Sequence, residues 1–538
     1  MTAPAHALAA ADPGSLTQSV DWLALAPALL PAALALVVLV ADLFLPARRK
    51  PLLGVASVLG LAAALLALLP LRAGDRATFC LTGPGTGTGP GAPPACSYAV
   101  DSLTLAVQLL VLGAALVTAL LSIATVRERR LPAGEYWFLL LSATAGAALM
   151  PAARDLITLI VALEVASLPA FALVGLRRGS RLSAEAALKF FLTSVTATAV
   201  TLLGVSFVYA TTGAVHLDRV ADGLDAVPAG LETLASVGVG LTLVGFAFKT
   251  AAVPFHFWVP DTYVGAPLPV AGYLSVVGKA VGLTGLILVT VHAFPGRADV
   301  WGPVLAVLAA LTTTLGNAAA VRQDPDRAHS AVRLLAWSSV AQAGFLLVPI
   351  AAAAYGDRDA IGATLAYALM YAAVNLGAFA VLTLTAADRP GGRLADLRGL
   401  YHRRPVPALA LAFFLLCLAG LPPGVIGLFA KVAVVRTAVD AGLGWLAVLL
   451  AVNVVVGLYY YLRWTALLFT RTPDTAPDPS PDTVAEPAPA ATPAAAPAPS
   501  PRTPWPTALA LAVTTGTALV LSAAPQLVLR LLDTHLAP

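Results

Sequence analysis

Charged residues are scarce in this sequence, and their scarcity excludes a water-soluble globular protein. Only 11% of the 538 residues are charged, whereas 59% are hydrophobic. A soluble protein needs about 25–35% of its surface residues to be charged. Apolar stretches of about 20 residues, long enough to cross a bilayer core, recur from end to end. We therefore expect an all-α polytopic membrane protein embedded in the lipid bilayer.

Motifs for redox chemistry and nucleotide binding are missing as well. The three cysteines are too few and too scattered for a metal cluster, and no haem-attachment motif or glycine-rich nucleotide loop is present. We expect no cofactor, metal site or redox centre in this chain, and no nucleic-acid partner. Cys80 and Cys96 lie in a glycine-rich loop, where a disulfide and two free thiols both remain open.

The apolar stretches predict about fourteen transmembrane helices. The chain divides into residues 1–99 with two helices and an outer loop, a core over 100–471, a Pro/Ala-rich linker over 472–504 and a last transmembrane helix within 505–538. We expect the linker to be extended and disordered on the cytoplasmic side. The predicted spans are 22–44, 51–71, 100–124, 133–151, 155–176, 183–210, 230–253, 266–292, 300–321, 330–354, 360–386, 406–436, 441–468 and 505–532.

Arginines in alternate short loops predict the orientation. Basic residues concentrate on the cytoplasmic side of a membrane protein. One set of alternate loops carries almost all of them, from Arg48, Arg49 and Lys50 through Arg127, Arg129, Arg130, Arg177, Arg178, Arg181, Arg322, Arg327 and Arg333 to Arg389, Arg393, Arg398, Arg403 and Arg404. With an even number of spans, both termini are then expected outside the cytoplasm.

Lysine is rare, and its placement differs from that of arginine. The chain has five lysines, and all but Lys50 fall within apolar helices. Arginine does not release its proton in a protein, whereas a buried lysine can. Lys249, Lys279 and Lys431 lie well inside apolar runs, which predicts sites that load and unload protons. Lys189 also has a structural interpretation, since it could reach the interface and pair with Glu185 one turn earlier.

Glu164 is the acidic counterpart, because it is the only charged residue between Ile157 and Leu176. A buried carboxylate needs a cationic partner to stay ionised, and Lys249 is the natural candidate. While the two groups face each other, the ammonium form is favoured. When they move apart, the lysine would pass its proton towards Lys279. A static ion pair that locks two helices together is the structural alternative.

Prolines interrupt two of the lysine-bearing helices. Pro254 follows Lys249 closely, and Pro422 and Pro423 precede Lys431. A proline removes a helix hydrogen bond, and broken helices in membranes occur where they face protein or a cavity. Two such helices in the two halves of the chain predict two inverted repeats with a site in each. Further candidates for extending the path are His256, Asp261 and His329, which as lone residues near helix ends are more often structural.

At FKTAAVPFHFWVPDTYVGAPLPVAGYLSVVGKA (248–280) the chain resembles the antiporter-like membrane subunits of respiratory complex I, the NADH-quinone oxidoreductases. The resemblance extends from about residue 100 to 470 and is strongest to the subunit N branch, through the Tyr-x-Gly-Ala-Pro run at 263–267 and through Lys431. The other similar segments are LEVASLPAFALVGLRR (163–178), EAALKFF (185–191), LLAWSSVAQAGFLL (334–347) and LAGLPPGVIGLFAK (418–431).

The resemblance implies one proton channel of a translocase in the plasma membrane, with other complex I membrane subunits as partners. NADH, FMN, iron–sulfur clusters and quinone are then expected in partner subunits. It implies Glu164 and Lys249 as a charge-switching pair, Lys279 as the central relay and Lys431 as the exit-side residue. Lys189 matches a further lysine of the family.

Three features depart from the family pattern. Gln342 stands where relatives often have histidine, the loop 323–330 looks long, and the 472–504 linker looks like an addition. Two other functions remain open. A cation/proton antiporter subunit would match the antiporter family better around residues 256–267, and a non-pumping membrane scaffold would tolerate neutral replacements of its buried lysines. A small-solute carrier fits less well, because the internal polar groups are titratable.

Overall fold

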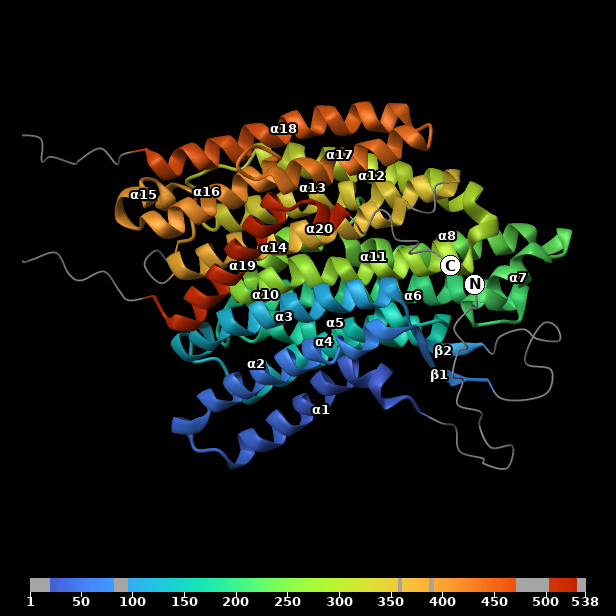
Figure 1. Ribbon diagram of the computed structural model, residues 1–538, viewed down its shortest axis with the longest axis horizontal. Helices are drawn as coiled ribbons and strands as arrows, with labels where there is room; N and C mark the ends of the chain where they lie inside the picture. The colour runs from blue at the N-terminus through green and yellow to red at the C-terminus, as the bar shows by residue number, and fades with distance from the viewer. Residues whose placement is uncertain (1–19, 82–94, 357–359, 387–390, 471–502, 530–538) are drawn as a thin grey trace, which may run out of the picture.

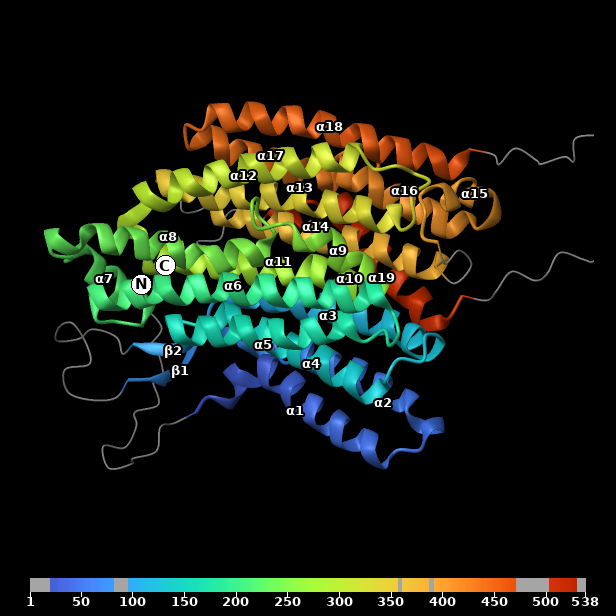
Figure 2. The same cartoon turned by 180° about the vertical axis from the view of Figure 1, so that it is seen from behind.

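The chain forms an elongated bundle of roughly parallel helices (Figure 1). The computed structural model describes residues 20–81, 95–356, 360–386, 391–470 and 503–529. Helices α1 and α2 run along one side of the bundle and α18 along the opposite side, with α11 and α14 between them (Figure 1). Seen from behind, α5 and α6 cover the same face as α8 and α12 (Figure 2). The predicted linker over 472–504 falls almost entirely outside the described residues.

The helices are α1 (Trp22–Phe44), α2 (Pro51–Leu66), α3 (Ser102–Glu128), α4 (Ala133–Leu149), α5 (Leu156–Gly175), α6 (Arg181–Thr212), α7 (Leu217–Asp225), α8 (Glu232–Thr250), α9 (Trp258–Gly265), α10 (Leu268–Tyr273), α11 (Lys279–Ile287), α12 (Ala298–Val321), α13 (Ser330–Ala352), α14 (Ile361–Thr385), α15 (Leu400–Arg403), α16 (Pro405–Ala419), α17 (Val425–Asp440), α18 (Gly444–Phe469), α19 (Trp505–Ala523) and α20 (Gln526–Leu529). The strands are β1 (Arg76–Cys80) and β2 (Cys96–Val100).

Short polar residues start several of the long helices. The carboxylates of Asp21, Asp101 and Asp155 accept hydrogen bonds from backbone N–H groups in the first turns of α1, α3 and α5, and the Ser180 hydroxyl does so for α6. Each cap satisfies N–H groups that have no partner inside the helix. These residues therefore fix where the apolar spans begin.

Twelve helices of the described ranges are long and apolar enough to cross a membrane, against the fourteen spans expected. Two of the expected spans contain helices that are shorter than the length used for this count of twelve. The predicted span 133–151 contains α4, which has only 17 residues. The predicted span 406–436 is divided into α16 and α17 by a break at residues 420–424. The other twelve predicted spans each overlap one of these long helices.

Both predicted helix breaks are present, one in each half of the core. Ala251 ends α8 in a left-handed conformation, and Pro254 lies in the irregular segment before α9. In the second half Gly420 has φ +84° at the end of α16, and two prolines separate it from α17. Left-handed backbone at a helix end favours glycine, and the prolines cannot continue the helical hydrogen-bond ladder. Their positions agree with the predicted pair of repeats.

The region 254–275, where a broken helix was one possibility, is divided between α9 and α10. A π-helical turn at Leu274–Gly278 then leads into α11, and a second one follows at Leu288–Ala293. Such turns within helices often mark functional sites. This composite span is completely buried, and α13 and α14 are nearly so. The centre of the bundle is therefore formed by the helix that carries Lys279 and its two neighbours.

Two features of the loops at one end of the bundle were not expected. Strands β1 and β2 pair antiparallel there, and a disulfide joins Cys80 to Cys96 at paired positions. The short helix α7 lies in the segment that the sequence suggested was a loop. Strands β1 and β2 lie at the end of the bundle opposite to α15 and its arginine-rich loop (Figure 1). The disulfide that the sequence left open is thus formed.

Candidate functional site

Lys249 and Glu164 lie near each other but do not form a direct ion pair. The Lys249 side chain is only 3% exposed, and its ammonium donates a hydrogen bond of 2.7 Å to Ser167 Oγ. Ser167 follows Glu164 by three residues on α5, so both face the same part of the bundle. The Glu164 carboxylate instead accepts a hydrogen bond of 2.6 Å from Thr198 on α6. The predicted partners are therefore in a separated arrangement.

Aromatic rings complete the surroundings of Lys249. The ammonium lies 5.2 Å from the centre of the Phe190 ring and 5.8 Å from that of Phe171. A cation at this distance from an aromatic face is attracted by its electron density. Trp258 from α9 stacks on Phe190 with 4.3 Å between ring centres. The lysine is therefore enclosed by α5, α6 and the broken helix.

Lys279 is held by the end of the helix that carries Lys249. Its side chain is 2% exposed, and its ammonium donates a hydrogen bond of 3.1 Å to the carbonyl of Thr250, the last residue of α8. Because α8 ends there, this carbonyl has no partner within its own helix. Gly282 permits the approach, since a Cβ there would lie 2.6 Å from the Thr250 nitrogen. The helix break thus creates the acceptor for the buried ammonium.

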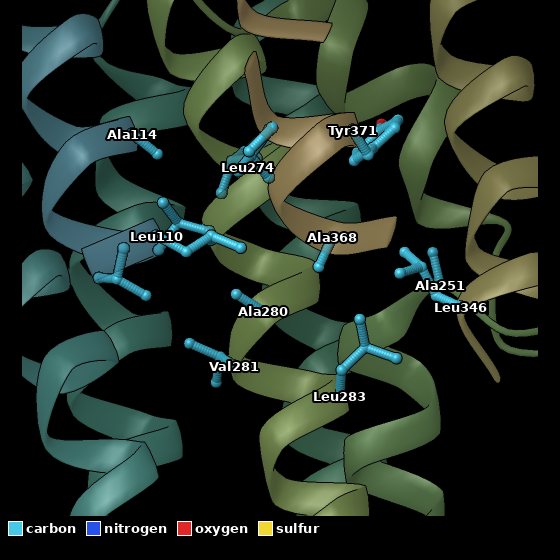
Figure 3. Packing of buried hydrophobic residues seen from close by; sticks show 14 of the residues in the cluster. Leu110, Ala114, Ala251, Leu274, Ala280, Val281, Leu283, Leu346, Ala368 and Tyr371 are labelled. Atoms are coloured by element: carbon cyan, nitrogen blue, oxygen red, sulfur yellow. The ribbon is translucent and has the colours of Figure 1, made fainter. Parts of the chain in front are cut away.

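Apolar side chains surround this part of the site. Figure 3 shows Ala280, Val281 and Leu283 projecting from the Lys279 helix, with Ala368 of α14 beside them. Leu110 from α3 closes the same region from the other side (Figure 3). A charge in such surroundings is costly unless it is hydrogen-bonded. The carbonyl contact therefore matters for whether Lys279 can hold a proton.

Lys431 repeats the arrangement in the second half of the chain. It is 5% exposed and donates hydrogen bonds to the carbonyls of Leu418 at 2.7 Å and Ala419 at 2.9 Å. These carbonyls belong to the last residues of α16, directly before the second break. The C-terminal end of a helix carries a partial negative charge that favours a cation. Both broken helices therefore supply carbonyls to a lysine of a neighbouring segment.

Gly427 and Gly424 allow the segment before Lys431 to fold against α16. A Cβ at Gly424 would lie 2.5 Å from Cys417 Cα, and one at Gly427 would overlap the Cys417 carbonyl. Glycine is therefore required for the close approach of α17 to α16. This approach brings Lys431 to the free carbonyls.

A hydrogen-bonded network that the sequence analysis missed fills the space between α13, α14 and α18. The Tyr461 hydroxyl lies 2.6 Å from Ser338 Oγ and accepts a hydrogen bond of 3.0 Å from the Gln342 amide. Tyr367 donates to the Gln342 carbonyl oxygen, and its ring stacks on Phe345. Gln342, which stands where relatives often have histidine, thus connects two tyrosines.

This network extends from the neighbourhood of Lys431 to that of Lys279. On one side the Lys431 ammonium lies 5.8 Å from the centre of the Phe345 ring, which stacks on Tyr367. On the other side Asn375 donates a hydrogen bond of 2.5 Å to Ser275, four residues before Lys279. Buried polar groups of this kind are rare in membrane interiors and are usually functional.

Tyr371 joins the same region through Ser339. Its hydroxyl donates a hydrogen bond of 2.8 Å to Ser339 Oγ, which also lies 3.4 Å from the Tyr263 hydroxyl. A sequence signal for α14 did exist, because Tyr367, Tyr371 and Asn375 recur every fourth residue and so share one helix face. Polar residues at helical spacing in an apolar span would have indicated the network.

Lys189 is not part of the buried set. Its side chain is 46% exposed and forms ion pairs with Glu185 at 2.7 Å and with Asp261 at 2.9 Å. The expected helix is present, and the Lys189 side chain projects from an exposed face of α6 rather than into the bundle. The Glu185 pair is the structural alternative stated above. Asp261 also lies 3.6 Å from Arg333, so it connects α9 to two basic side chains.

The two histidines proposed to extend the path have partners other than the buried lysines. His256 is half-buried in the first break, with its ring centre 5.5 Å from that of Trp337. His329 precedes α13 with φ +59°, and its backbone N–H donates to Gly391. No group of three or more potential metal ligands occurs in the described ranges.

Comparison with known proteins gives consistent matches. Residues 153–457 match the family described as "NADH:quinone oxidoreductase/Mrp antiporter, TM". The chain is 67% identical over 530 residues to NADH-quinone oxidoreductase subunit N 2 of Streptomyces griseus subsp. griseus, covering 98% of this chain and 96% of that relative.

Solved structures agree in fold. A chain of respiratory complex I from Thermus thermophilus superposes with a TM-score of 0.71 at 30% identity, covering 94% of this chain and 98% of that one. A chain of the Mrp complex from Dietzia sp. gives a TM-score of 0.76 at 23% identity, covering 95% and 96%. At that identity the second match concerns the fold alone.

Proposed function

The chain belongs to the NADH-quinone oxidoreductase subunit N family, and we propose that it moves protons across the membrane through Glu164, Lys249, Lys279 and Lys431. Electron transfer from NADH to quinone would take place in partner subunits that hold FMN and iron–sulfur clusters. The chain would act as one membrane subunit of this translocase in the plasma membrane.

One observation carries the proposal. Each of the three buried lysines donates its hydrogen bonds to neutral oxygen atoms, the Ser167 hydroxyl or backbone carbonyls, and not to a carboxylate. A lysine paired directly with a carboxylate would leave an unpaired buried charge on losing its proton. A lysine bound to neutral acceptors can release a proton without that penalty. The arrangement suits a relay better than a static ion pair.

The separated Glu164 and Lys249 suggest how a proton would be driven inward. If the Glu164 carboxylate leaves Thr198 and approaches Lys249, the ammonium form gains a counter-charge. When the carboxylate returns to Thr198, the ammonium keeps only the Ser167 hydroxyl. The proton then moves towards Lys279, whose acceptor Thr250 directly follows Lys249 in the chain. Water must bridge the groups, since no direct hydrogen bond joins the lysines in the described ranges.

From Lys279 the path would continue through the α13–α14–α18 network to Lys431. Hydroxyl groups both donate and accept hydrogen bonds, so Ser339, Tyr371 and Tyr461 can pass protons along a chain. The Gln342 amide orders two of these tyrosines without titrating. Lys431 would then release the proton on the far side.

The different features at the two ends of the helix bundle support the orientation in the membrane that the arginine-rich loops predict. The disulfide-bonded strands lie at the end of the bundle opposite to the arginine-rich loop that contains α15 (Figure 1). Disulfides persist outside the cytoplasm, and basic loops concentrate inside it. We place both termini outside the cytoplasm on this basis.

Purification of the chain with its partners tests the assignment against the antiporter alternative. The tagged full-length chain, isolated with its native complex, should copurify with NADH-dependent quinone reduction. The pH inside vesicles that contain the purified complex should then change only when both NADH and quinone are present. A complex that oxidises no NADH and exchanges sodium for protons down an imposed gradient would identify a cation/proton antiporter subunit instead.

A further inference from the structure

A cavity of about 400 Å³ lies at the end of the bundle that carries the arginine-rich loops. Three arginines from separate loops line its polar part: Arg129 after α3, Arg177 after α5 and Arg393 before α15. Its remaining wall is largely apolar and includes Leu268 and Leu382. The cavity therefore combines a cationic part with an apolar part.

Basic side chains outnumber acidic ones among the described residues that line this cavity. Burial and the neighbouring Arg129 lower the pKa of the Arg177 guanidinium. His329, which also lines the cavity, has its pKa lowered by burial and then by Arg177 and Arg333. Like charges thus act on one another across the cavity. Neither Arg129 nor Arg177 forms an ion pair with an acid in the described ranges.

Two acids line the cavity as well, and they do not remove this excess. Glu128 is exposed at the end of α3, as are Arg129 and Arg393, whereas Arg177 is half-buried. Asp396 uses one carboxylate oxygen to accept the backbone N–H of Arg393 at 3.0 Å. Among the described residues that line the cavity, three arginines therefore face two acids, which leaves an excess of one positive charge. An anion from outside the chain would complete the site.

We propose that this cavity binds the phosphate of an anionic phospholipid. Guanidinium groups match the oxygen geometry of phosphate and bind it with paired hydrogen bonds. Arg129 and Arg177 lie one and two residues beyond the ends of the membrane helices α3 and α5, which corresponds to the height of the lipid headgroups. Basic pockets between helices on the cytoplasmic side are typical headgroup sites. The apolar wall suits the first acyl carbons of a phospholipid, which a soluble phosphate compound lacks.

This inference does not depend on proton transfer through the lysines. A matched pair of double variants tests it in the assembled complex. R129Q/R177Q removes two cavity arginines, whereas R130Q/R178Q removes the next residue in each of the same two loops. Arg130 and Arg178 are exposed and do not line the cavity. Both variants change the net charge equally.

The measurement is photo-crosslinking in nanodiscs of phosphatidylcholine that contain a phosphatidylglycerol probe with a photoreactive headgroup. Wild type and R130Q/R178Q should give labelled peptides from Ala331–Val332 and Leu382–Thr385, which line the cavity. R129Q/R177Q should lower this labelling roughly thirtyfold at subsaturating probe. Normal recovery of the complex on purification serves as the folding control.

Three results would overturn the proposal. Equal labelling of these peptides in both double variants would show that the cavity arginines do not hold the headgroup. Equal labelling by a phosphatidylcholine probe would remove the requirement for an anionic lipid. Displacement of the probe by millimolar inorganic phosphate or glycerol 3-phosphate would identify a soluble phosphate compound as the occupant.

Discussion

Lys279 donates its hydrogen bond to the carbonyl of Thr250, the residue that directly follows Lys249 in the chain. The two lysines come from different helices, yet the end of one helix holds the ammonium carried by the other. Any movement of the α8 end would change both environments together. This physical coupling between Lys249 and Lys279 does not require a direct contact between their side chains.

Replacing Lys431 by arginine should abolish proton translocation while keeping the positive charge. The guanidinium can still bind the Leu418 and Ala419 carbonyls, but it does not release its proton. Proton uptake per NADH oxidised should fall by about tenfold or more. The control is Arg436→Lys, an exposed position on the same helix. Unchanged pumping by Lys431→Arg would mean that only the charge at this position matters.

Ser167→Ala should weaken the protonated form of Lys249. A hydrogen bond to a charged group contributes about 1.5–3 kcal/mol, so its loss should reduce turnover by roughly tenfold or more. Ser206→Ala serves as the control, because that exposed hydroxyl bonds only to its own helix. The measurement is the pH profile of NADH-driven quinone reduction in membranes. A profile identical to wild type would exclude Ser167 as the partner of Lys249 during turnover.

Tyr461→Phe should slow proton transfer without preventing assembly. The change removes the hydroxyl that connects Ser338 with Gln342 and leaves the ring in place. Loss of one such contact costs about 1 kcal/mol, which corresponds to roughly fivefold in rate. Tyr459→Phe, two residues away and 55% exposed, should behave as wild type. Equal rates for the two variants would place the proton path outside this network.

Lys189→Gln should affect pumping far less than changes at the buried lysines. An exposed ion pair contributes about 0–1 kcal/mol, and both of its carboxylate partners reach solvent. We expect proton uptake within about twofold of wild type. A loss as large as that of Lys431→Arg would return Lys189 to the relay.

The sequence predicted which lysines belong to the candidate site, but it did not predict their hydrogen-bond acceptors. The position of Lys249, Lys279 and Lys431 inside apolar spans, where a lysine is costly, predicted that these three side chains are special, and the structure buries all three. Their acceptors could not be predicted. Ser167 and Thr250 become partners only through the packing of separate helices, which hydropathy does not describe.

Other differences have equally local causes. Lys189 lies in an apolar helix as expected, but the face on which it projects depends on neighbours that the pattern of one helix does not reveal. The span containing α4 is shorter than expected, because hydropathy continues into the following turn at Met150–Ala152. The helical spacing of Tyr367, Tyr371 and Asn375 on α14 could have predicted the network. It did not enter the prediction, because tyrosine in an apolar run also occurs as an ordinary packing residue.

Lys249→Ala in the assembled complex tests the central claim most directly. NADH-driven quinone reduction and proton uptake into vesicles should be measured on the same preparation. We predict that the complex assembles and that proton uptake falls by about tenfold or more, alone or together with quinone reduction. If both rates stay at wild-type values, Lys249 does not carry protons and the chain acts as a structural scaffold at this site.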